Sequence, residues 1–206
     1  MVATVEIHEA NGGTDGNPGT KTKVNGVGVN DGTDVRFCTK DAFNPVATSP
    51  CIIPPDGTGF NYSFWKHLFL DISGTYTTLN HIRFYTDGTI SWTLGTGGGL
   101  YVGIRTTGDN GCPMDASYEV ATGVVNTSGD TMDGNHSYYT GASGSVVDAK
   151  VYKSDATLDI DSTSYGPNAA VDSNAVVLQV KLDTSINGCV QGTQVDETLT
   201  FIYDEI

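Results

Sequence analysis

The sequence predicts an all-β protein, an antiparallel β-sandwich of jelly-roll type with long loops rich in glycine and asparagine. Two aromatic-rich segments between Phe64 and Trp92 suit a half-buried pleated surface and flank a short threonine-rich corner. Asn-Gly and Asp-Gly pairs, which favour tight hairpin turns, recur between short β-rich runs. They stand at 11–12, 25–26, 31–32, 56–57, 87–88, 110–111, 133–134 and 187–188. An immunoglobulin-like sandwich fits the same turn spacing, since turn spacing does not reveal strand order.

The first half of the chain divides into extended runs and irregular connections. Residues 2–7 alternate between apolar and polar side chains and predict a first strand. The segment 11–34 is rich in glycine, asparagine and threonine and has little to bury, so we expect a flexible loop or arm there. A short strand is predicted at 33–38, followed by an irregular, proline-containing connection at 44–59.

The second half contains shorter extended runs. A strand is predicted at 100–105, after the glycine-rich run 95–99. Two further strands are predicted at 118–125 and 137–140, and a polar edge strand at 148–152.

The clearest alternation lies near the end of the chain. One side of the predicted strand carries Val176, Leu178, Val180 and Leu182, and the other carries Gln179, Lys181 and Asp183. In the last segment, Leu199, Phe201 and Tyr203 alternate with Thr200, Ile202 and Asp204. Both ends of the sequence are therefore predicted to be strands tied into the sheets of one domain spanning 1–206.

Composition and charge exclude several classes of partner. The chain has 206 residues, with 24 acidic against 10 basic residues and a net charge of −14. Without a basic stripe to neutralise phosphates, we expect no direct nucleic-acid binding. The segment Met1–Ile7 has neither the basic stretch nor the apolar run of a signal peptide, and no apolar run reaches bilayer length. We expect a product made in the cytoplasm that has no membrane partner.

The four cysteines, Cys38, Cys51, Cys112 and Cys189, include no C-x-x-C pair, which argues against the common zinc and thioredoxin-like motifs. Cys38 and Cys51 flank a proline-containing loop and would form a disulfide in an oxidising compartment. In a cytosolic product, free buried thiols are the expectation.

No catalytic group is nominated. The segment Gly141–Ser145 lacks the glycine that a nucleophile elbow requires two positions after its serine. His67 and His81 would begin a metal site if they met across adjacent strands, although a hydrogen-bonded surface pair is the commoner role. Only a buried pair of Asp71 and Asp87 in a groove would reopen the hypothesis of a glycan-degrading enzyme.

Calcium is the metal that the acidic turns would favour, because they offer hard oxygen ligands. Asp155, Asp159 and Asp161 form one such run, and Asp130 with Asp133 another. Neither run has the spacing of an EF-hand, so no cofactor is predicted.

Aromatic side chains offer a platform on which the apolar face of a sugar would stack, if they are exposed. The candidates are Trp65, Trp92, Tyr101, Tyr138, Tyr139 and Tyr165. The competing interpretation is that the tryptophans belong to the core; it is favoured for Trp65 and left open for Trp92.

Three segments carry a resemblance to a known family. They are residues 5–12 (VEIHEANG), 82–88 (IRFYTDG) and 197–206 (ETLTFIYDEI). Together they resemble small β-rich virion structural proteins of tailed bacteriophages and related prokaryotic viruses. The resemblance covers both ends and the middle of the chain, and its motifs mark strands and turns rather than a site.

The resemblance implies a non-enzymatic structural protein located in the virion, with capsid decoration or cementing as the leading role. It implies the major capsid protein or other virion proteins as partners, and self-association, with a trimer favoured. Apolar or flexible character nominates the partner-docking residues Val24, Val27, Val29, Trp92, Tyr138, Tyr139, Phe201 and Tyr203.

Two alternatives remain open. A neck or tail component of the virion fits the same resemblance. From a different class, a carbohydrate-binding or adhesin module would show a shallow site with solvent-facing Trp92 or tyrosines and calcium nearby.

Overall fold

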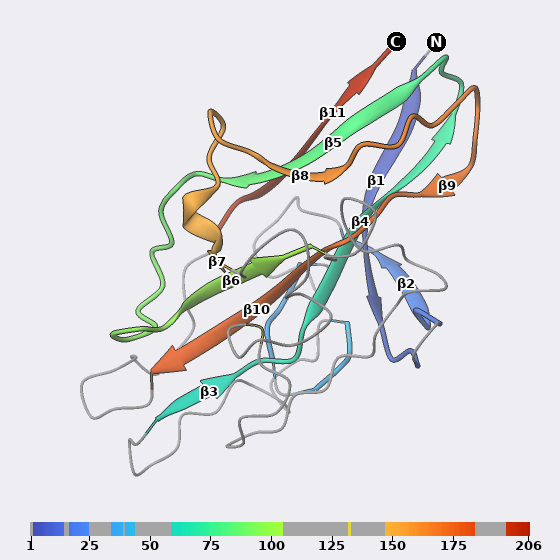
Figure 1. The fold of residues 1–206 in the computed structure, drawn as a ribbon. Coiled ribbons are helices and arrows are strands. Elements are labelled where there is room, and N and C mark those ends of the chain that lie inside the picture. The colour runs from blue at the N-terminus through green and yellow to red at the C-terminus, as the bar shows by residue number, and fades with distance from the viewer. Residues whose placement is uncertain are drawn as a thin grey trace.

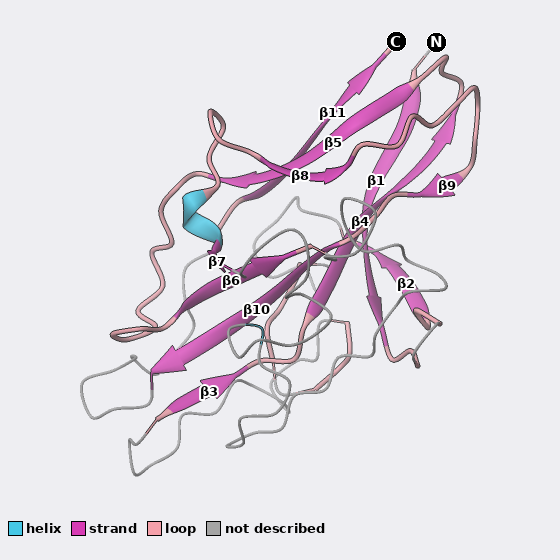
Figure 2. Ribbon diagram, in the orientation of Figure 1, coloured by secondary structure: helices cyan, strands magenta, loops and turns pink. Residues whose placement is uncertain are grey.

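The computed structural model describes residues 2–14, 17–24, 34–38, 40–43, 59–104, 132, 147–183 and 197–206. The described residues form two antiparallel sheets that pack as a β-sandwich, which confirms the predicted class (Figure 1). Regular helix within this part is confined to short turns such as the 3-10 turn η2 (Ala149–Val151) (Figure 2). None of the described segments is a helix of the length and apolarity that crossing a membrane requires.

The larger sheet has eight strands. Its main path runs β2 (Thr20–Lys23), β1 (Ala3–Asn11), β4 (Lys66–Gly74), β10 (Val176–Asp183), β6 (Gly99–Gly103) and β7 (Val147–Asp148). Off this path, β3 (Phe60–Tyr62) pairs with β10, and β9 (Val171–Asp172) pairs with β4. The longest register joins β1 to β4, from Ala3 opposite Gly74 to Ala10 opposite His67.

The smaller sheet has three strands in the order β11 (Leu199–Glu205), β5 (Leu79–Thr86) and β8 (Leu158–Asp161). β4 and β5 are the two aromatic-rich strands that the sequence predicts, but each belongs to a different sheet. The chain passes between the sheets through the corner after Gly74, whose φ of +89° favours glycine.

The main core lies between the two sheets. The inward side chains of β4, β5, β6, β8 and β10 meet there, and Phe84, Ile82 and Leu178 are fully buried. The predicted alternation of β10 is confirmed on this side, since Val176, Leu178, Val180 and Leu182 all belong to this core.

The opposite face of β10 carries Gln179, Lys181 and Asp183, and it too is partly covered. A second cluster, of Ala10, Trp65, Phe69, Met132, Ala175 and Val177, covers part of that face. Gln179 is buried among them: its Oε1 accepts from Met132 N at 2.8 Å and its Nε2 donates to Ser63 O at 2.9 Å. Trp65 is 1% exposed, so its assignment to the core is confirmed.

Both ends of the chain are tied into the sandwich, as predicted, and they lie side by side (Figure 1). Ala3 N donates to Glu205 Oε1 at 2.8 Å, which joins the first strand of one sheet to the last strand of the other. Thr77 N and Thr78 N both donate to Ile206 O at 3.0 Å, so the corner between β4 and β5 holds the final residue.

Three local predictions are corrected. The expected arm is not loose throughout, because residues 20–23 form β2 and pair with the end of β1. Residues 34–38 form no strand, only a bridge at Cys38. The expected edge strand at 148–152 stops at Asp148, whose side chain accepts from Lys150 N and begins the turn η2.

Several other predictions fall outside the described residues. These are the middle of the arm at 25–33, most of the connection at 44–59, and the strands at 118–125 and 137–140. Cys38 is described as a free, buried thiol that lies 3.0 Å from Lys40 O. The jelly-roll connection, which runs partly through the same segments, stays a prediction.

Candidate functional site

The candidate site lies on the outer face of the smaller sheet, where β5 bulges. His81 has φ +50°, which makes it the one non-glycine strand residue in the described part of the chain with a left-handed backbone. Both neighbours of β5 shift register beside it, β11 between Ile202 and Asp204 and β8 opposite Ile82 and Arg83. Bulges of this kind re-aim side chains and gather near functional sites, so the backbone itself marks this position.

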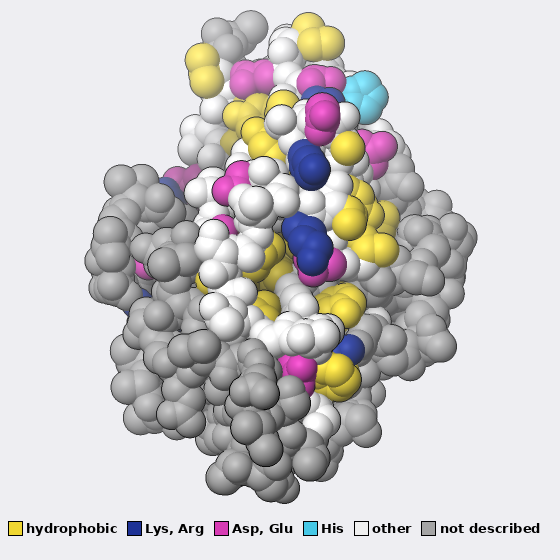
Figure 3. All heavy atoms as spheres, turned by 90° about the vertical axis from the view of Figure 1, so that its left-hand side faces the viewer, with side chains coloured by type: hydrophobic (Ala, Val, Ile, Leu, Met, Phe, Trp, Pro, Cys, Tyr) yellow, Lys and Arg dark blue, Asp and Glu magenta, His cyan; other side chains and the backbone are white. Residues whose placement is uncertain are grey.

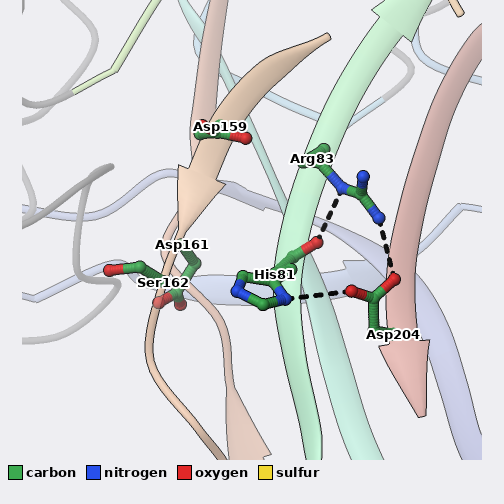
Figure 4. Close-up of a pocket in the computed structure, with 6 residues that line it drawn as sticks. All are labelled: His81, Arg83, Asp159, Asp161, Ser162 and Asp204. Carbon is green, nitrogen blue, oxygen red and sulfur yellow. Dashed lines mark hydrogen bonds and ion pairs between the residues drawn. The ribbon is translucent and has the colours of Figure 1, made fainter.

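The bulge brings three charged side chains together (Figure 4). His81 Nδ1 lies 2.9 Å from Asp204 Oδ2, and Arg83 Nη2 donates to Asp204 Oδ1 at 2.9 Å. Arg83 Nε also donates to the carbonyl oxygen of His81 at 3.1 Å, which holds the bulged peptide. The Asp204 carboxylate therefore bridges the Arg83 guanidinium and the His81 imidazole of β5, while its own side chain remains about half exposed.

A shallow pocket continues from this cluster toward β8, where Asp159, Asp161 and Ser162 complete its lining. Asp161 is 1% exposed and is held internally. Its carboxylate accepts from Tyr165 Oη at 2.6 Å and from Asn174 N at 2.8 Å. Burial, together with this carboxylate, raises the pKa of the Tyr165 hydroxyl. Asp161 is thus the buried member of the pocket lining, and the exposed polar groups of the lining include those of Asp159, His81, Arg83 and Asp204.

The surface suits binding a polar partner through several weak contacts. It offers acceptors on Asp159 and Asp204 and donors on Arg83 and His81, all accessible from solvent. On the face seen in Figure 3, the described residues likewise mix acidic, basic and apolar side chains without one large patch of a single kind.

The two histidines that would have begun a metal site do not meet. His67 lies on β4 of the larger sheet and is fully buried, whereas His81 is on β5 of the smaller sheet and contacts Asp204. Among the described residues, no group of three or more His, Cys, Asp or Glu side chains is placed to hold a metal ion. Asp155, Asp159 and Asp161 therefore do not converge, and Asp130 and Asp133 lie outside the described residues.

The acid pair that would have indicated a glycan-degrading enzyme is not formed either. Asp71 is half-buried on β4, and Asp87 is exposed after β5. The Asp87 carboxylate accepts from Thr89 N at 2.8 Å and from Thr89 Oγ1 at 2.9 Å, as the side chain of a turn does.

Four of the predicted docking residues lie against the core. Val24, Trp92, Phe201 and Tyr203 are partly buried there. The ring of Trp92 meets Phe37 edge-on at 6.0 Å, and Phe201 meets Phe84 at 5.7 Å. Val27, Val29, Tyr138 and Tyr139 lie outside the described residues. The part of the described four in docking stays a prediction.

Sequence reasoning did not find the cluster of His81, Arg83 and Asp204. The available signal was that His81 and Arg83 lie two residues apart on one predicted strand and Asp204 lies on the last. Pairing of these two strands would bring the three side chains together.

A second surface lies around Lys181, and of its aromatic residues only Tyr101 had been named from the sequence. Its Nζ lies 3.9 Å from the ring centre of Phe60, 5.8 Å from that of Tyr62 and 5.7 Å from that of Tyr101. Phe60 is 42% exposed. The ammonium thus contacts three rings that border solvent.

Comparison of the chain with protein-family models, with curated proteins and with solved structures finds no match. Its function has to be inferred from its own residues and geometry.

Proposed function

We propose that this chain is a non-enzymatic structural protein of a virus particle, a decoration or cement protein that binds the major capsid shell and stabilises it. The observation that carries the proposal is the outer strand of the smaller sheet, which we call the docking edge. β11 is the outer strand of that sheet in the described part of the chain, and it stands beside the bulged surface of His81 and Arg83.

An outer strand offers backbone donors and acceptors to a partner strand, which is how extended segments add to a sheet. β11 has seven residues, and its core-facing side is anchored by Phe201 and Tyr203. Ile202, 37% exposed, points the other way, beside the half-exposed Asp204. Strand addition would supply affinity, and the side chains of the bulge would supply register and specificity.

The location and the oligomeric state come from the resemblance of residues 5–12, 82–88 and 197–206 to virion structural proteins. Two of these segments overlap β5 and β11, the strands that form the docking edge. A trimer that bridges capsid subunits would present three such edges around one axis. Each edge would add contacts across joints that the pressure of the packaged genome tends to open.

The test is quantitative mass spectrometry of purified virus particles from the source of the sequence. A copy number comparable to that of the major capsid protein supports decoration. A few copies per particle would favour a neck or tail component instead. Absence from the particles would overturn the structural-protein proposal.

A carbohydrate-binding module is the second candidate, and the rings of Phe60, Tyr62 and Tyr101 around Lys181 favour it. Aromatic rings that border solvent can stack on a pyranose when the lysine swings aside. A glycan array probed with the native protein and with the Phe60→Ala variant tests this candidate. Binding that disappears in the variant would support it, and no binding by the native protein would reject it.

A further inference from the structure

The far end of the β1–β4 pair holds an ion pair that is removed from water. Lys66 Nζ lies 2.7 Å from Glu9 Oε1, and the two side chains are 1% and 0% exposed. The ammonium makes a second hydrogen bond, of 2.7 Å, to Ala42 O. Taking both charges out of water is costly, and the attraction between them often only offsets that cost. Such a site favours any reaction that removes the charges.

A buried amide stands next to this pair. The register of β1 and β4 ends with Ala10 opposite His67, and one further step sets Asn11 opposite Lys66. Directly opposed residues of antiparallel strands have Cβ atoms about 4.5–5.5 Å apart, within reach of a lysine side chain. Asn11 and Glu9 are two residues apart on one strand and so project from the same face.

The polar groups of this cluster are incompletely satisfied. Asn11 is 8% exposed, and its Nδ2 makes no hydrogen bond of ordinary geometry to any described residue. The same holds for Glu9 Oε2 within the described part of the chain. Burial raises the pKa of the Glu9 carboxyl, against opposing effects that include the nearby Asn11 amide. Glu9 therefore faces both the Lys66 amine and the Asn11 amide.

We propose that Lys66 and Asn11 become joined by an isopeptide bond, with Glu9 carrying protons between the two side chains. The arrangement contains the three groups that this reaction requires: a buried amine, a buried amide and a carboxyl in contact with the amine. All three project from the same end of two hydrogen-bonded strands, and the proposal is independent of the virion role.

The reaction balances without an oxidant, a metal or a further reactant. Glu9 takes one proton from the Lys66 ammonium, and the neutral Nζ attacks Asn11 Cγ. Glu9 then protonates the departing Nδ2, accepts the remaining proton from Nζ and passes it to the released ammonia, which leaves as an ammonium ion. A Cγ–Nζ bond forms and the Cγ–Nδ2 bond breaks. The side-chain amide and the ammonium give a secondary amide and one ammonium ion, and Glu9 ends unchanged.

The product removes the unfavourable features of the unreacted site. The buried ammonium becomes a neutral N–H, which can still donate to Glu9. The unsatisfied Nδ2 leaves as an ammonium ion. A covalent link then joins β1 to β4, two central neighbours of the larger sheet, and constrains the unfolded chain as a disulfide does.

Intact mass spectrometry of the denatured full-length protein tests the proposal without any substitution. The expected mass is lower than the sequence mass by one molecule of ammonia, and digestion yields a branched peptide that joins Asn11 to Lys66. The unmodified mass would overturn the proposal. Loss of water instead of ammonia would also overturn it, since that loss assigns the bond to a carboxyl such as Asp41 or Glu9.

Variants separate the roles of the residues. Lys66→Arg keeps the positive charge but removes the nucleophilic amine, and we expect the full sequence mass. Glu9→Gln keeps the shape of the side chain but cannot exchange protons, so the linked fraction should fall to a minor species. The matched control is Lys23→Arg, since Lys23 pairs with Glu6 on the exposed side of β2 and should leave the link intact. Circular dichroism confirms that each variant folds before its mass is interpreted.

Discussion

Two ion-paired clusters of this molecule use the same kinds of side chain in opposite surroundings. Around His81, the carboxylate of Asp204 meets Arg83 and His81 in contact with water, with exposures of 28% for Arg83 and 61% for His81. At the other cluster, Lys66 and Glu9 meet with almost no exposure. Water screens the first cluster, so its charges remain available to a partner and contribute little to stability.

The buried cluster behaves differently because each charge depends on the other. Neither Lys66 nor Glu9 has solvent to replace a lost partner, so the pair is sensitive to single substitutions and prone to chemistry that neutralises it. We propose that the exposed cluster serves recognition and that the buried cluster maintains the larger sheet. Four predictions test that assignment, from the largest expected effect to the smallest.

Removing one partner of the buried pair should be the most damaging change. Glu9→Ala leaves the Lys66 ammonium uncompensated, and we expect a loss of roughly 3–5 kcal/mol in the free energy of unfolding. Chemical denaturation measures it. The double variant Glu9→Leu/Lys66→Met buries no charge and should recover the part of that loss that comes from the uncompensated ammonium, but not the stabilisation that a link between Asn11 and Lys66 would add. A single variant as stable as the native protein would show that the cluster is open to water.

Acid should destabilise the protein through His67. Burial, with a smaller contribution from Lys66, lowers the pKa of the His67 imidazole from 6.5 to about 3. The unfolded chain then binds this proton more readily than the folded chain does. The stability that His67 contributes is therefore present above pH 6.5 and is lost as the pH falls toward 3, by at most about 1.4 kcal/mol per pH unit.

Denaturation midpoints measured across this range check the prediction, with His67→Phe as the control. The variant should show a shallower dependence on pH, whatever its absolute stability. An identical slope in both proteins would assign the acid sensitivity to other groups.

The strained backbone at His81 should yield a smaller effect. Replacing this residue with glycine relieves a left-handed conformation that costs an L-residue about 1–2 kcal/mol. Two effects oppose this gain: glycine in a strand loses more conformational entropy on folding, and the contact with Asp204 is lost. We expect His81→Gly to change the unfolding free energy by less than about 1 kcal/mol, and His81→Val to destabilise more. The melting temperatures of the two variants separate the effect of backbone strain at residue 81 from the effect of losing the contact with Asp204.

The smallest effect on stability should come from Asp204. Asp204→Asn weakens two exposed ion pairs, and such pairs contribute about 0–1 kcal/mol each. Binding to capsids, measured by co-sedimentation, should nevertheless weaken severalfold if the bulged surface is the docking site. Asp159→Asn on the same face and Asp155→Asn away from it provide graded controls. Unchanged binding in Asp204→Asn would separate the docking surface from this cluster.

Parts of the architecture were predictable because their signal is local. The alternation in β10 and β11, and the aromatic runs of β4 and β5, identified strands before their partners were known. The cluster of His81, Arg83 and Asp204 was not predictable in the same way. His81 and Asp204 lie 123 residues apart in sequence, and their contact depends on two register shifts that no composition reveals.

The sequence by itself determined that the chain is all-β, that its net charge is −14, and which segments are strands near its two ends. These properties follow from side-chain period, turn chemistry and charge, which act between near neighbours. Only the tertiary structure decided that β4 and β5 separate into different sheets and that both faces of β10 are covered. It also decided that Lys66 meets Glu9 57 residues away. Strand pairing chooses among distant partners by burial and register, and that choice depends on the whole chain at once.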